Sequence, residues 1–221
     1  MRNAEILSNK SDGIEKFVKI TTRFQEVIEQ MSLPIKSNPS LILSEFAKAD
    51  SARQETFLNK ISLYTELIEL AAVENINILR DKRFLWQSFR KLNVVPSSDL
   101  FEKIAPGDYI EVYDPNGIQI FANFEFCALT SYTFEEIAWF PWEELFGRDS
   151  KHTEAIMNEF ARCFTEAKGP FKPNIEDHLC WEIMSEDKKR ATASMKMFAP
   201  IFGLDKKPKA MLATSNIQLL I

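Results

Sequence analysis

Glycine, cysteine and histidine are scarce in this sequence of 221 residues, which contains 6 Gly, 3 Cys and 2 His. The cysteines Cys127, Cys163 and Cys180 are too few and too widely spaced for a disulfide framework. This favours reduced thiols in a cytoplasmic compartment, although secretion as an effector stays open. No zinc-ligand spacing links the cysteines to His152 or His178, so no metal site is predicted, and both histidines are predicted to lie at the surface.

Long apolar runs, phosphate-binding motifs and a basic excess are also missing. No run approaches the roughly 18 apolar residues of a membrane-spanning helix, and no Gly-rich nucleotide loop or H-E-x-x-H motif occurs. His178 and Cys180 share one side of a predicted strand, but no orienting carboxylate or oxyanion hole accompanies them. The net charge of -5 and pI of about 5.3 disfavour nucleic-acid binding. We therefore expect a protein without a membrane span or enzymatic activity.

Residues 1–95 carry apolar side chains at helical spacing, which predicts an N-terminal helical domain. Because no Gly or Pro interrupts residues 52–92, one long helix or two joined helices are expected there. A heptad seam lies in this segment, with a polar residue where it can fix register. Its residues are Phe57, Ile61, Tyr64, Ile68, Ala71 and Ile78, with Asn75 as the polar residue. Two interpretations stay open: the core of a helical bundle, or an interface for a homodimer or a protein partner.

Residues 96–221 have a different pattern, which predicts an α+β domain. The turn sequence Asp114–Gly117 joins two short strand-like segments into a hairpin. A helical block follows, and three strands then form a meander over about 179–184, 191–202 and 210–219. We expect a five-stranded antiparallel sheet with helices on one face and the hairpin next to the meander.

Three motifs of this domain resemble the PAS family. The Asp114–Gly117 turn is similar to the Asp-x-x-Gly turn between the family's first two strands. A run resembling Leu-Thr-Gly-Tyr-(Ser/Thr)-x-Glu-Glu follows an Asn that ends the second strand, with Ser131 in place of the usual Gly. The matching residues are Asn123, Leu129, Thr130, Tyr132, Thr133, Glu135 and Glu136. Ala199–Pro208 resembles the last hairpin. The resemblance covers slightly over half the chain and implies a cupped sheet packed against short helices.

The cofactor of a PAS-like cup must be argued from its residues, because fold does not imply ligand. Flavin photosensors of the family carry an Asn-Cys-Arg-Phe-Leu-Gln run, whereas Cys127 here lacks the flanking Asn and Arg. This disfavours a flavin photoadduct. Neither histidine is suitably placed as an axial haem ligand. The cofactor, if there is one, is therefore unknown.

Large apolar side chains are the candidates for the cup lining. Alternation along a strand places Met195 and Met197 on one face. The full set is Phe124, Phe126, Phe140, Trp142, Trp181, Met195, Met197 and Phe198. Such residues form either a filled core or a pocket for a small apolar or aromatic ligand.

The first functional interpretation is a sensory regulator of a bacterial-type signalling pathway. It would sense a ligand or a change in dimer packing and relay it through the helical half. The rival is a non-catalytic adaptor or effector that docks a partner protein and binds no small molecule. No output domain is expected after Leu219, so the output is a partner protein or the chain is a fragment of a longer one.

Overall fold

The chain forms two compact units. The computed structural model describes residues 2–79 and 81–220, with side chains from Asp12 onward. The helical unit consists of the chain up to Ile76 together with Thr133–Trp139, and the sheet unit consists of Asn77–Tyr132 and the chain from Phe140 onward. Each unit therefore combines separate stretches of sequence. The division into folding domains 1–95 and 96–221 stays a prediction.

The helical unit contains three consecutive helices and one short helix from later in the chain. These are α1 (Arg2–Gln30), α2 (Ser40–Lys48), α3 (Ser51–Val73) and α7 (Phe134–Trp139). Helix α1 packs against α2 and α3, and α7 packs against α2 and α3. The Thr133–Glu136 pair begins α7 as a capping box, since Thr133 N donates to Glu136 Oε2 at 2.8 Å and Glu136 N to Thr133 Oγ1 at 3.3 Å.

The predicted seam of α3 lies in the interior of the helical unit. Four of its residues, Phe57, Ile61, Tyr64 and Ile68, are at most 1% exposed. The Tyr64 ring lies 4.5 Å from that of Phe134 on α7. The structure therefore places these four residues in a bundle core, where the chain's own helices cover them.

Asn75 is not part of this seam, because α3 ends before it. Asn75 has a left-handed backbone, with φ of 52°. Its N–H donates to Ala72 O at 3.3 Å, and Ile76 N donates to Ala71 O at 2.8 Å. These two bonds form a Schellman motif, which ends a helix in a residue with positive φ. Of the two forms expected for residues 52–92, one long helix or two helices, the structure has two, because α4 (Lys82–Lys91) is separate from α3. Residue 80 lies outside the described residues.

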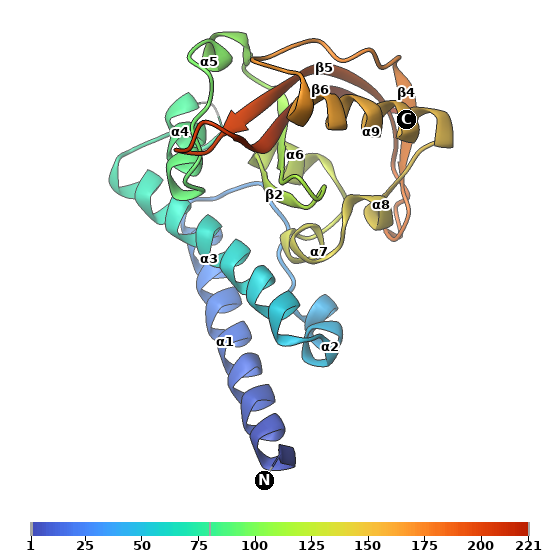
Figure 1. The fold of residues 1–221 in the computed structure, drawn as a ribbon. Helices are drawn as coiled ribbons and strands as arrows, with labels where there is room; N and C mark the ends of the chain where they lie inside the picture. The colour runs from blue at the N-terminus through green and yellow to red at the C-terminus, as the bar shows by residue number, and fades with distance from the viewer. Residues whose placement is uncertain (1, 80, 221) are drawn as a thin grey trace. The chain divides into compact units, whose positions relative to one another are not determined.

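The sheet unit is an antiparallel sheet with short helices, as expected for the α+β class. Its strands are β1 (Tyr109–Tyr113), β2 (Gln119–Ala122), β3 (Phe146–Gly147), β4 (His178–Glu182), β5 (Arg190–Phe202) and β6 (Pro208–Leu220). The helices are α4, α5 (Leu100–Lys103), α6 (Phe124–Leu129), α8 (Trp142–Leu145) and α9 (Ser150–Thr165). Figure 1 shows α9 beside the long β5–β6 pair, against which it packs.

The strand order is β2-β1-β6-β5-β4-β3. The hairpin β1–β2 therefore lies next to the meander, as predicted. The expected count of five strands is wrong, because the two-residue strand β3 pairs with β4 at the sheet edge. Such a short segment has no alternation that the sequence could reveal.

No helix in the described part of the chain is long and apolar enough to cross a membrane.

Candidate ligand-binding cup

A cavity of about 370 Å³ lies inside the sheet unit. We call it the cup. Side chains of the sheet and of α6, α8 and α9 line it, and most of the lining is apolar. Principal wall residues are Tyr113, Phe126, Trp142, Phe146, Ile156, Phe160, Cys180, Trp181, Met195, Phe198, Met211 and Ala213. Ligand pockets have volumes of about 300–1,000 Å³ and are mostly apolar, so the cup has the size and character of a small-molecule site.

The structure brings five of the eight predicted lining residues together at the cup. These are Phe126, Trp142, Trp181, Met195 and Phe198. Phe124, Phe140 and Met197 are not among its lining residues. The Phe124 ring instead lies 5.5 Å from Phe84 of α4, and the half-buried Phe140 precedes α8.

A β-bulge explains the position of Met197. Met195 pairs with Ser215, but Met197 pairs with Thr214, so the register shifts by one residue at Lys196. The shift reverses the alternation, and Phe198 rather than Met197 falls on the cup face with Met195. The prediction that Met195 and Met197 share a face is therefore wrong.

Trp181 reaches the cup wall because its neighbour on β3 is a glycine. Gly147 pairs with Trp181, and a Cβ at Gly147 would lie 2.3 Å from the indole Nε1. A side chain at this position would displace the indole ring. Gly147 therefore determines where this wall of the cup lies.

Polar groups in the cup are few and mostly paired. On β1, Glu111 Oε1 accepts hydrogen bonds from the Tyr113 hydroxyl at 2.6 Å and from Gln119 Nε2 at 2.7 Å. Burial, together with the charge of Glu111, raises the pKa of Tyr113 well above its usual value. The hydroxyl thus stays protonated and donates to the carboxylate.

Arg148 also lines the cup, although it was not among the predicted lining residues. It lies between β3 and α9, directly before Asp149, whose side chain accepts from His152 N and caps α9. The guanidinium carbon lies 4.5 Å from the Trp142 ring centroid. Its Nε is buried and has no hydrogen-bond partner among the described residues. Its place at the cup depends on the contact with Trp142 and on the folded sheet, which the local sequence does not reveal.

Two further residues hold the wall between α6 and β4. The buried carboxylate of Glu182 accepts from Ser131 N at 2.6 Å and from Ser185 Oγ at 2.6 Å. The Tyr132 hydroxyl donates to Leu145 O at 2.6 Å and accepts from the main-chain N–H of Ile183 and Met184. Tyr132 was predicted only as part of a family motif; its bonds reach residues 13, 51 and 52 positions further along the chain, which local sequence does not reveal.

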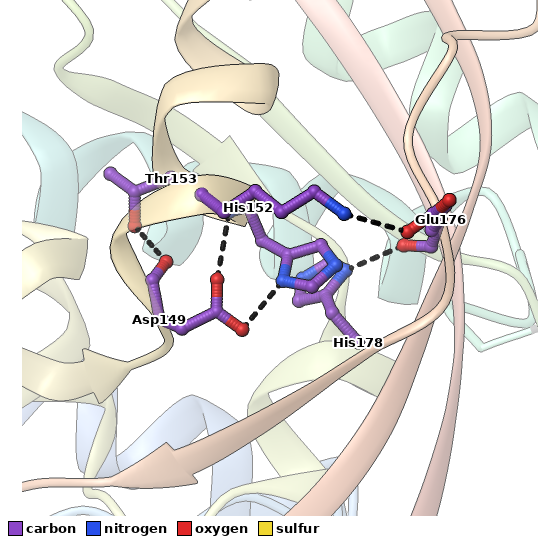
Figure 2. Close-up of polar contacts among 6 residues, drawn as sticks. Asp149, His152, Thr153, Glu176 and His178 are labelled. Carbon is purple, nitrogen blue, oxygen red and sulfur yellow. Dashed lines mark hydrogen bonds and ion pairs between the residues drawn. The ribbon is translucent and has the colours of Figure 1, made fainter.

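The two histidines lie together, His152 on α9 and His178 on β4 (Figure 2). The Nδ1 of His152 lies 2.7 Å from Asp149 Oδ2, and that of His178 lies 3.1 Å from Glu176 O. His178 is only 3% exposed, so the prediction of a surface side chain is wrong for it. Pairing of β4 with β5 and the neighbouring His152 ring cover it. Across the described residues, no group of three metal-ligating side chains is arranged to hold a metal ion.

Solved structures similar to this chain include PAS-type domains. A PAS domain from Colwellia psychrerythraea is 22% identical at a TM-score of 0.37, and the match covers 50% of this chain and 85% of that one. The light-state dimer of the fungal blue-light photoreceptor Vivid is 12% identical at 0.39, covering 60% and 90%. A sensory box sensor histidine kinase from Vibrio cholerae is 10% identical at 0.33, covering 64% and 100%. No protein-family model and no curated protein matches the chain.

Proposed function

We propose that this chain is a PAS-type sensory protein that binds a small, mostly apolar ligand in the cup and has no enzymatic activity of its own. The observation that carries the proposal is the cavity of about 370 Å³ in the sheet unit. Its apolar walls and few polar groups suit a small molecule.

Helix α7 is the element that would carry the signal to the helical unit. The residues on both sides of it, Tyr132 and Phe140, belong to the sheet unit, whereas α7 belongs to the helical unit. Its Phe134 ring lies 4.6 Å from Phe24, and its Trp139 ring lies 5.7 Å from Phe57. The chain on either side of α7 includes Thr130 and Trp142, which line the cup. A ligand that moves these walls would pull on α7 through the backbone, to the extent that it binds two conformations differently.

Two substitutions on either side of the bulge test whether the cup is open to ligands. In the Met195→Trp variant, the new ring enters the cavity from a half-buried position, so we expect little loss of stability and no ligand binding. In the Met197→Trp variant, the ring enters the densely packed opposite face, which costs about 1–3 kcal/mol of unfolding free energy. Urea unfolding measures stability, and thermal shifts with a library of small aromatic molecules measure binding.

The matched pair separates the sensor from its rival. If wild-type protein binds library members and Met195→Trp does not, the cup is a ligand site. If Met195→Trp is as destabilised as Met197→Trp and nothing raises the melting temperature of the wild type, the cup is a filled core. The non-catalytic adaptor or effector would then replace the sensor.

A further inference from the structure

Arg148 gives the cup a chemical preference. We infer that the ligand is a monocarboxylic acid with an apolar, aromatic body, whose carboxylate binds the Arg148 guanidinium. This inference rests on the proposed ligand-binding function of the cup and names the class of ligand.

The first step is that Arg148 lacks a counter-ion. The cup is otherwise mostly apolar, and the Nε of Arg148 is buried without a hydrogen-bond partner among the described residues. No carboxylate in the described chain forms an ion pair with this guanidinium. A buried donor without a partner costs free energy, and an anion that supplies the acceptor recovers it. The planar guanidinium matches a carboxylate in a two-pronged geometry.

The other charged groups of the lining are already engaged or screened. Lys189 Nζ donates to Leu129 O at 2.9 Å, and Glu182 accepts from Ser131 N and Ser185 Oγ. Glu111 accepts from two donors of its own hairpin. Glu143 is exposed, where water and salt screen its charge. Among the described lining residues, Arg148 is the cation with a buried donor that has no hydrogen-bond partner, and one planar guanidinium matches one carboxylate.

The second step concerns the body of the ligand. The Arg148 guanidinium lies over the Trp142 ring, in a cation–π contact that holds it at this wall of the cup. Aromatic rings of Phe126, Phe146, Trp181 and Phe198 surround the remaining space. Aromatic side chains pack favourably against other rings in offset or edge-to-face contacts. A flat aromatic body with its carboxylate at Arg148 satisfies both parts of the lining.

The test compares two probes that share a naphthalene ring, 2-naphthoate with its carboxylate and 2-naphthalenemethanol with a neutral hydroxymethyl group, by isothermal titration calorimetry with the full chain at pH 7.5. We expect wild-type protein to bind the acid at least about 10-fold more tightly, since a hydrogen-bonded charge contributes about 1.5–3 kcal/mol and 1.4 kcal/mol is tenfold. In the Arg148→Gln variant the ratio should fall to about 1, with binding of the alcohol unchanged. Arg148→Lys should retain part of the preference. Arg190→Gln removes the same charge from an exposed residue that does not line the cup, and should retain all of it.

The outcomes separate the two proposals. Equal binding of acid and alcohol by the wild type overturns the carboxylate assignment and leaves the cup as a ligand site. A preference that survives in Arg148→Gln overturns the role of Arg148. Tighter binding of 2-naphthyl phosphate than of 2-naphthoate overturns the assignment of the ligand as a monocarboxylic acid. If neither naphthalene probe binds and the aromatic library gives no shift, the ligand-binding function itself fails.

Discussion

The imidazole rings of His152 and His178 stack face to face, with centroids 4.9 Å apart and planes inclined by 19°. Figure 2 shows Asp149 beside His152 and Glu176 beside His178. Burial lowers the pKa of His178, and the positive charge of Arg148 and the neighbouring His152 lower it further, whereas its bond to Glu176 O acts in the opposite direction. The stacked pair is therefore most stable when His178 is neutral.

The first prediction is that the protein loses stability as the pH falls below about 6.5, the usual histidine pKa. In this pH window the unfolded chain binds a proton at His178 that the folded chain does not. Protonation therefore stabilises the unfolded state and lowers the free energy of unfolding. The loss is complete once the pH is below the lowered pKa of His178. Urea midpoints measured between pH 7.5 and 5.5 should fall for the wild type and change less for His178→Phe, which keeps a ring against His152. Equal slopes for the two proteins would contradict this.

A second prediction concerns the end of α3. Because Asn75 has φ of 52°, we expect Asn75→Ala to destabilise the protein by about 1 kcal/mol, since a Cβ without a compensating side-chain bond is strained there. Asn75→Gly should be neutral or stabilising. The control is Asn59→Ala in the exposed middle of the same helix, which should stabilise by a few tenths of a kcal/mol through helix propensity. Chemical unfolding measures all three, and the same sign for both Ala variants would contradict the assignment of the helix end.

Local chemistry was readable from the sequence. The turn at Asp114 forms as predicted, with its Oδ1 accepting from Asn116 N and Ile118 N and with Gly117 at φ of 78°. The two long strands of the meander also formed as predicted, and the capping box at Thr133 is set by residues three positions apart. In each case the residues that determine the structure are close together in sequence, so their spacing carries the information.

The missed features depend on contacts between distant segments. At Lys196, β5 has one residue more than β6 between two successive paired positions. Nothing in the sequence of β5 marks this bulge, because it is defined by the pairing with β6. Asn75 fits a heptad position and a helix end equally well, and only the Schellman bonds decide between them. The burial of His178 depends on α9, which precedes it by more than ten residues. Five lining residues of the cup could be predicted from the sequence, but Arg148 could not.

A third prediction tests the Tyr132 hydroxyl. Tyr132→Phe removes a group that is bonded to three main-chain atoms and leaves the N–H groups of Ile183 and Met184 without that acceptor. We expect a loss of about 1–3 kcal/mol in unfolding free energy. Tyr109→Phe is the matched control, because the Tyr109 hydroxyl has no hydrogen bond among the described residues. Similar urea midpoints for the two variants would show that the Tyr132 bonds contribute little.

The last prediction uses the cysteines as reporters of the cup. Cys180 lines it, whereas Cys163 is fully buried and Cys127 is 3% exposed. Burial raises the pKa of the Cys180 thiol, and it raises the pKa of Cys163 to about 12. Because the thiolate is the reactive form, iodoacetamide should modify Cys180 first, more slowly than free cysteine at pH 7.5 and faster as the pH rises.

Peptide mapping by mass spectrometry after timed exposure to iodoacetamide follows the three sites. Cys163 should react only when the protein unfolds, so its modification should follow the urea midpoint. In the Met195→Trp variant the new ring occupies part of the cup that Cys180 also lines, and the modification of Cys180 should slow relative to Met197→Trp at equal stability. The Cys180→Ser variant should lack the modified Cys180 peptide, which identifies that peptide in the mass spectra. If Cys127 or Cys163 reacts as fast as Cys180 in the native protein, the reagent enters through a general opening of the sheet unit, and the cup is not a separately accessible cavity.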